Sequence, residues 1–94
     1  MPSKPSRRAE RRVREHLQAQ GYLVLRTRPT DLADFVAMKR AGECRTAVTL
    51  VRVTKARPAR REVARLLREA RFVGASLWVA TVPRGGAMEW RRVR

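Results

Sequence analysis

The most informative residues of this chain are its arginines, because their number and spacing could support the binding of phosphate groups. The 94 residues include 20 Arg and 3 Lys against 8 acidic residues, which gives a formal net charge of +15. A guanidinium group is a planar fork of N–H donors that binds a phosphate through two hydrogen bonds. A chain this basic repels itself unless polyanions are nearby. The composition therefore favours nucleic acid as the partner, although a GC-rich genome or a hot habitat would also enrich arginine.

Two groups of arginines are the candidate phosphate-binding residues. The denser group lies on a predicted N-terminal helix that could rest against a duplex backbone, and the other is spread over three later segments. The alternative interpretation of the helical group is a solvated helix face. Contacts of this kind position a ligand without reading its bases. The residues are Arg7, Arg8, Arg11 and Arg12 in the first group, and Arg26, Arg28, Arg57, Arg60 and Arg61 in the second.

Other kinds of site find no support in the sequence. The chain contains no Gly-rich phosphate loop, CxxC pair, HExxH helix or nucleophile elbow. Cys44 is the only cysteine, so it cannot form an internal disulfide, and His16 has no catalytic neighbours. No apolar run approaches the roughly 20 residues that span a bilayer, and no signal-peptide pattern opens the chain. We therefore expect a cytoplasmic protein without a membrane partner.

Hydrophobic periodicity predicts an αβββαβ order of elements. Residues 1–6 contain two prolines and two serines, which suits a flexible basic tail, and residues 7–94 are long enough for a single domain with one core. Apolar residues at core spacing, with a glycine after each run, predict two helices. The predicted helices are 7–20 and 58–73, and the predicted strands are 22–27, 34–39, 46–54 and 76–82, with 88–93 as an extra edge strand.

The strand pattern predicts a mixed sheet. Ala41-Gly42-Glu43 turns the second strand into the third, so these two strands form an antiparallel hairpin. The run 76–82 is almost continuously apolar, which is typical of a strand buried on both faces. The two helices would supply that cover, one on each side. The expected fold class is α/β, with a mixed central sheet flanked by helices in three layers.

Four short motifs share one resemblance. Glu10 lies on the first helix upstream of Gly21-Tyr22, and Arg26-Thr27 is followed by Thr30. Residues 33–37 read ADFVA, and residues 50–54 read LVRVT. In this order the motifs resemble the PD-(D/E)xK nuclease superfamily, nearest the archaeal type of Holliday-junction resolvase. The resemblance covers most of the chain and implies a restriction-endonuclease-like fold.

The resemblance also implies where an active site would lie. Asp34 falls at the position of the family's metal-binding aspartate, and Glu10 at that of an acid facing the site. The family has an acid and a lysine where Arg52 and Thr54 stand. Mg²⁺ requires oxygen ligands, and a guanidinium in place of a carboxylate changes the local charge by two units. We therefore expect Arg52 to pair with Asp34, with no metal and no cofactor bound. The alternative is that Arg52 is one more surface arginine and that Asp34 caps a turn.

Lys55 is the residue on which activity would depend. Neighbouring strand residues point to opposite faces, so only a β-bulge at Val53 or Thr54 would turn Lys55 toward the site. Without it, the sequence predicts a nucleic-acid-binding protein, DNA favoured over RNA, that lacks metal-dependent cleavage. The alternative is an active Mg²⁺-dependent endonuclease using Glu10, Asp34 and Lys55, and a third interpretation is a structural RNA-binding protein. The resemblance also implies that the chain can form a homodimer.

Overall fold

The computed structural model of the chain describes residues 7–27 and 33–93. The predicted tail 1–6, together with Arg28 and Thr30, lies outside the described residues. Within them the predicted αβββαβ order is confirmed, and the extra edge strand is present. The elements are α1 (Arg7–Ala19), β1 (Leu23–Arg26), β2 (Phe35–Gly42), β3 (Arg45–Thr54), α2 (Arg60–Phe72), β4 (Ser76–Thr81) and β5 (Glu89–Val93).

The five strands form one mixed sheet in the order β1-β2-β3-β4-β5. β2 and β3 form the predicted antiparallel hairpin, with Phe35 opposite Val51. β3 and β4 run parallel, because α2 carries the chain back across the sheet between them. β1 and β5 are antiparallel edge strands. The predicted mixed sheet is therefore confirmed.

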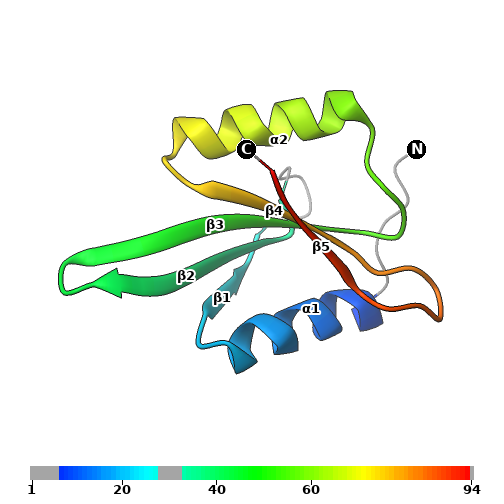
Figure 1. Ribbon diagram of the computed structural model, residues 1–94, viewed down its shortest axis with the longest axis horizontal. Helices are drawn as coiled ribbons and strands as arrows, with labels where there is room; N and C mark the ends of the chain where they lie inside the picture. Colours follow the sequence, from blue (N-terminus) through cyan, green and yellow to red (C-terminus); the bar gives the residue numbers. More distant parts are fainter. Residues whose placement is uncertain (1–6, 28–32, 94) are drawn as a thin grey trace.

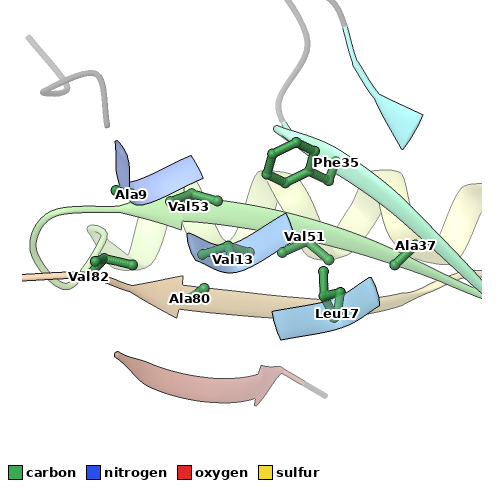
Figure 2. Close-up of a cluster of buried hydrophobic side chains, with 9 residues drawn as sticks. All are labelled: Ala9, Val13, Leu17, Phe35, Ala37, Val51, Val53, Ala80 and Val82. Carbon is green, nitrogen blue, oxygen red and sulfur yellow. The ribbon is translucent and has the colours of Figure 1, made fainter. Parts of the chain in front are cut away.

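The two helices cover opposite faces of the sheet, as Figure 1 shows. On one face, Ala9, Val13 and Leu17 of α1 pack into a core formed with β2, β3 and β4 (Figure 2). On the other face, Leu66 and Ala70 of α2 pack on Leu77. β4 contributes Ala80 to the first cluster and Leu77 to the second, so it is buried on both faces, as its apolar run predicted.

The boundaries of two elements differ from prediction by two or more residues, and those of the others by no more than one. β2 continues to Gly42, three residues beyond the predicted end, because Arg40 and Gly42 pair with Thr46 and Arg45 of β3 although residues 40–42 are exposed. α2 begins at Arg60, so Pro58 does not open the helix. Ala59 holds an extended conformation at the N-cap, with φ −64° and ψ 149°. Pro58 therefore belongs to the connection that follows β3.

Glycine ends both helices, as predicted. Gly21 and Gly74 have φ of 90° and 71°, in the left-handed region that other residues rarely adopt. After Gly21, the N–H of Tyr22 donates to the carbonyl of Leu17 at 3.1 Å. After Gly74, the N–H of Ala75 donates to the carbonyl of Ala70 at 2.7 Å. Each turn directs the chain into the strand that follows. Neither described helix is long and apolar enough to cross a membrane.

Candidate functional site

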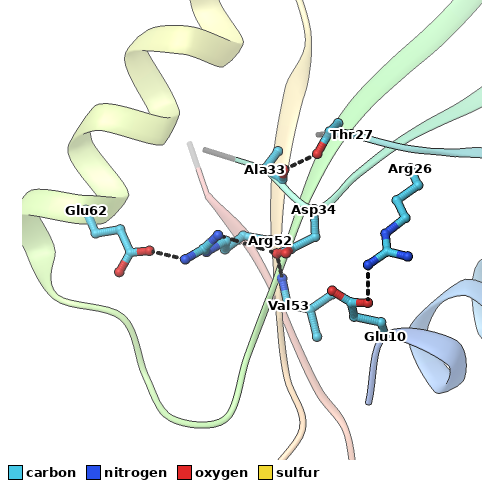
Figure 3. A network of polar contacts seen from close by, with 8 residues as sticks. All are labelled: Glu10, Arg26, Thr27, Ala33, Asp34, Arg52, Val53 and Glu62. Carbon is cyan, nitrogen blue, oxygen red and sulfur yellow. Dashed lines mark hydrogen bonds and ion pairs between the residues drawn. The ribbon is translucent and has the colours of Figure 1, made fainter. Parts of the chain in front are cut away.

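The hairpin register places Asp34 opposite Arg52. Asp34 directly precedes β2, and its N–H donates to the carbonyl of Val51 at 2.9 Å, which extends the ladder by one residue. Thr27, at the end of β1, holds the same segment from the other side. Its N–H donates to the carbonyl of Asp34 at 3.0 Å, and its hydroxyl donates to the carbonyl of Ala33 (Figure 3). The backbone that carries Asp34 is thus fixed between two strands.

The Asp34 carboxylate has two partners from β3. Its Oδ2 accepts a hydrogen bond of 2.7 Å from the N–H of Val53 and lies 3.6 Å from Nη1 of Arg52 (Figure 3). Both charged side chains are largely buried, with exposed fractions of 15% for Asp34 and 17% for Arg52. The ion pair that was expected across the hairpin is therefore present. At 3.6 Å it is an electrostatic contact and not a hydrogen bond.

Arg52 has a closer partner that sequence reasoning missed. Its Nη2 lies 2.9 Å from Oε1 of Glu62, which stands in the first turn of α2. The guanidinium group therefore lies between two carboxylates, one beside β2 and one on α2 (Figure 3). The only sequence feature that could have pointed to Glu62 is its place as an acid in the first turn of the helix that follows β3. Its contact with Arg52 depends on how α2 packs on the sheet.

Burial raises the pKa of Asp34 above its ordinary value, because it removes water from the charged form. The Val53 N–H and the Arg52 guanidinium act in the opposite direction, since both stabilise the carboxylate. The negative charges of Glu10 and Glu62 add to the rise in the pKa. Three carboxylates therefore influence this end of the sheet, and Arg52 offsets only part of the cost of ionising Asp34.

Glu10 lies at the margin of the site and has its own partner. Its Oε2 is 3.3 Å from Nη2 of Arg26 at the end of β1. The Glu10 side chain is 18% exposed, whereas that of Arg26 is 66% exposed. Arg26 therefore neutralises Glu10 on one side and leaves most of its guanidinium group open to solvent.

Thr54 and Lys55 end β3 without a bulge. Thr54 is buried, and its Oγ1 lies 3.4 Å from Oγ1 of Thr81 on the neighbouring strand. The β3·β4 ladder stays in register through Thr54, and the N–H of Val82 donates to the carbonyl of Thr54 at 2.8 Å. Lys55 is exposed beyond the strand. The distortion at Val53 or Thr54 that would turn Lys55 inward is not seen in this ladder.

The acids around Arg52 do not fit a divalent cation. A hard cation needs several converging oxygen ligands, and here the facing oxygens of Asp34 and Glu62 already surround a guanidinium group. In the described part of the chain, no group of three or more His, Cys, Asp and Glu side chains is arranged to hold a metal ion. The positive charge at this position is part of the protein itself.

Most of the predicted phosphate-binding arginines come from segments that meet at this end of the sheet, namely the start of α1, the end of β1 and the residues between β3 and the first turn of α2. The first turns of both helices are at the same end of the sheet, since Glu10 of α1 acts on Asp34 and Glu62 of α2 contacts Arg52. Backbone N–H groups at helix N-termini add partial positive charge there. All the described members of the set are exposed, although Arg11 is paired with Glu15 at 3.1 Å. They are Arg7, Arg8, Arg11, Arg12, Arg26, Arg57, Arg60 and Arg61; Arg28 lies outside the described residues.

A hollow of about 340 Å³ adjoins the segment before α2. Its lining includes Arg57 and Pro58, Thr81 of β4, and Glu89 and Arg91 of β5. The two arginines favour a phosphate group in this hollow, whereas the carboxylate of Glu89 opposes one. Trp90 also lines it, but its ring stacks on His16 at a centroid distance of 5.1 Å and packs against the core. Trp90 is therefore engaged within the protein, and so is His16.

The comparisons with known proteins agree with this fold. No protein-family model matches the chain, and no curated protein matches it. Among solved structures, it is similar to Hjc, a Holliday junction resolvase from the archaeal hyperthermophile Archaeoglobus fulgidus. The TM-score is 0.66 at 27% sequence identity, over 90% of this chain and 70% of that chain. The resemblance that the motifs predicted, and the restriction-endonuclease-like fold that it implied, are confirmed.

Proposed function

From the restriction-endonuclease-like fold that this chain shares with an archaeal Holliday junction resolvase, we propose that it binds nucleic acid through backbone phosphates and does not cut it. The observation that carries the proposal is the Arg52 guanidinium between the carboxylates of Asp34 and Glu62. A nuclease of this type would need a cation at such a position. Here a side chain supplies the positive charge.

The charge at Arg52 opposes metal-dependent cleavage. A divalent cation that approached Asp34 would meet a fixed positive charge 3.6 Å from the same carboxylate oxygen. To bind, it would have to displace Arg52 from both acids and leave a guanidinium group unpaired in a poorly hydrated place. The buried Thr54 also offers no amine to assist an attacking water. We therefore expect neither metal binding nor hydrolysis.

The charge around the site favours the binding of nucleic acid. Exposed arginines from α1, β1 and the start of α2 gather where both helix N-termini add positive charge. Phosphate contacts of this kind supply affinity that does not depend on base sequence. We propose DNA as the preferred ligand, because the similar solved structure is a Holliday junction resolvase.

The competing function is an active Mg²⁺-dependent endonuclease. It is favoured by one observation, that Asp34 is under the electrostatic influence of both Glu10 and Glu62. If Arg52 swung away on binding nucleic acid, these acids could serve a metal ion. This function would also require Lys55 to turn inward from its exposed position beyond β3.

A paired binding and cleavage assay separates the two functions. Purified protein is mixed with a four-way DNA junction, a linear duplex and a structured RNA, each with Mg²⁺, with Mn²⁺ and with EDTA. We expect retarded DNA complexes in all three conditions and intact strands on denaturing gels. Nicking that needs Mg²⁺ and stops with EDTA would establish the endonuclease, and tight binding to RNA alone would favour the third interpretation.

Salt dependence tests the phosphate mechanism itself. For binding to duplex DNA, the logarithm of the association constant should fall with the logarithm of salt concentration by about 0.9 for each phosphate neutralised. The variant Arg57→Ala/Arg60→Ala should flatten that slope. A slope near zero in the unmodified protein would contradict binding through phosphates.

We also propose that two copies of the chain associate, as the resemblance to the resolvases implies. The support is an apolar surface on the sheet face opposite α1, where α2 covers β4 but not β1. Leu23 and Leu25 of β1 are 60% and 49% exposed there. They pair with Met38 and Val36 of β2 in the ladder. An apolar surface on so basic a chain suits a second copy, because contact there removes hydrocarbon from water without bringing arginines together.

A further inference from the structure

The outer half of the β2–β3 hairpin projects beyond the rest of the sheet. Figure 1 shows it reaching away from both helices, at the opposite end of the long axis from the start of α2. Every residue from 39 to 47 is exposed, so this part of the hairpin is uncovered on both faces. We call residues 39–47 the hairpin arm. The arm adds nothing to either hydrophobic cluster, and its function must be sought outside the core.

The side chains of the hairpin arm are basic or small. Lys39, Arg40 and Arg45 carry three positive charges against the one negative charge of Glu43. The remaining side chains are small: Ala41, Gly42, Cys44, Thr46 and Ala47. The hairpin arm has no large apolar residue, so it offers a protein partner little hydrocarbon to bury. Its positive charge and its narrow, two-stranded shape both suit a polyanion.

The geometry of the arm fits a groove of a duplex. Two paired strands lie about 4.8 Å apart. The major groove of B-form DNA is about 12 Å wide and admits such a two-stranded ribbon. The ladder is irregular between Arg40 and Gly42, and irregularities of this kind increase local twist. Lys39 is less free than the two arginines, because its Nζ lies 5.2 Å from the centre of the Tyr22 ring.

We infer that the hairpin arm is a second contact for nucleic acid, in which the ribbon enters a groove and Arg40 and Arg45 bind the flanking phosphates. The inference rests on the proposed function and adds a contact at the far end of the molecule. The longest dimension of the described protein is 40 Å. A duplex along this axis would span about 12 base pairs at about 3.4 Å each.

A pair of variants with equal charge tests the inference. The arm variant is Arg40→Ala/Arg45→Ala, and the control is Arg65→Ala/Arg68→Ala, which removes two exposed arginines from α2. On a duplex longer than about 12 base pairs, the arm variant should lower the salt slope by about 1.8, and the control should not. On a duplex half that length, the unmodified protein and the arm variant should bind alike.

The outcomes distinguish the arm from the proposed function. If the arm variant and the control behave alike while Arg57→Ala/Arg60→Ala loses affinity, the arm inference is wrong and the nucleic-acid function stands. If the unmodified protein binds no nucleic acid in low salt, both fail.

Cys44 gives a direct second readout. It is exposed in the turn at the tip of the arm and is the only cysteine of the chain, so a thiol-linked photocrosslinker can be attached there alone. Irradiation of the DNA complex should form a crosslink between the reagent at Cys44 and the DNA. Crosslinking to a second protein copy, or to nothing, would overturn the inference.

Discussion

At the scale of single residues, the site is governed by one guanidinium group and the acids around it. The sequence predicted that Arg52 pairs with Asp34, because opposite charges were expected on adjacent antiparallel strands. It did not predict Glu62, because that contact depends on how α2 packs on the sheet and not on any local pattern. Thr27 shows the same limit, since its hydrogen bond to Ala33 closes a turn whose shape no local sequence rule specifies.

Removal of the guanidinium should destabilise the protein. Arg52→Met keeps much of the side-chain length but leaves Asp34 and Glu62 without their shared cation. Breaking a buried ion pair from one side costs about 3 kcal/mol, because the remaining charges stay poorly hydrated. Urea denaturation at pH 7 measures the loss, with Arg65→Met on the exposed face of α2 as the control. Equal free energies of unfolding for the two variants would show that the Arg52 ion pairs do not stabilise the fold.

Asp34 should make stability depend on pH. Since burial raises the pKa of Asp34, the folded protein takes up this proton more readily than the unfolded chain. The cost of ionisation is therefore fully present above the folded pKa and is relieved as the pH falls toward about 4, the ordinary value for Asp. Asp34→Asn should match or exceed the stability of the unmodified protein at pH 7, and the difference should shrink toward pH 4.

Asp34→Ala is the matched control, because it also removes the acceptor for the Val53 N–H. This variant should lose about 1–3 kcal/mol at pH 7 through the unpaired donor. Urea denaturation at pH 7, 5.5 and 4 gives all three curves. An advantage of the unmodified protein over Asp34→Asn at pH 7 that vanishes at pH 4 would mean that the ion pair outweighs burial.

At the scale of elements, sequence periodicity was a good guide wherever one face is buried. α1, the apolar strand β4 and the glycine ends of both helices follow directly from such patterns. The hairpin was predicted, but the extension of its strands into the outer part of the hairpin arm was not, because strands exposed on both faces have no alternation to detect. The start of α2 was misplaced for a related reason. Pro58 suits a helix start, yet the chain stays extended through Ala59.

Substitutions of Gly74 test the left-handed backbone conformation that ends α2. Its φ of 71° is unfavourable for a residue with a Cβ atom, and no heavy atom lies within 4 Å of where that Cβ would be. Gly74→Ala should therefore lose about 1 kcal/mol through backbone strain alone. Gly74→Asn should lose less, since asparagine tolerates this region. Thermal denaturation of the three proteins measures the order, and a fully stable Gly74→Ala protein would contradict the assigned conformation.

At the scale of the whole molecule, the basic regions and the apolar surface have different proposed roles, the first in binding nucleic acid and the second in binding another copy of the chain. The start of α2, whose Glu62 contacts Arg52, and the hairpin arm lie at opposite ends of the long axis (Figure 1). The apolar surface of β1 lies on the α2 side of the sheet, where α2 covers β4 but not β1. Nucleic acid can therefore be held along the molecule while a second copy covers that surface. The net charge predicted such a ligand, but its distribution over the surface required the fold.

The proposed dimer can be tested at this scale. Leu25→Glu puts a charge in the centre of the apolar surface and should yield monomers, whereas Thr46→Glu in the hairpin arm should leave the dimer intact. Sedimentation equilibrium of the free proteins in moderate salt distinguishes the two, because the ionic strength screens the repulsion between copies. If the unmodified protein stays monomeric at high protein concentration, the proposed dimer is wrong. The proposal that Arg52 takes the place of a metal ion does not depend on that result.

Calorimetric titration of Mn²⁺ into metal-free protein tests whether Arg52 takes the place of a divalent cation. We predict no stoichiometric binding to the unmodified protein, and binding to Arg52→Glu, in which a carboxylate joins Asp34 and Glu62 in place of the guanidinium group. One equivalent of Mn²⁺ bound by the unmodified protein and lost in Asp34→Ala would contradict the claim.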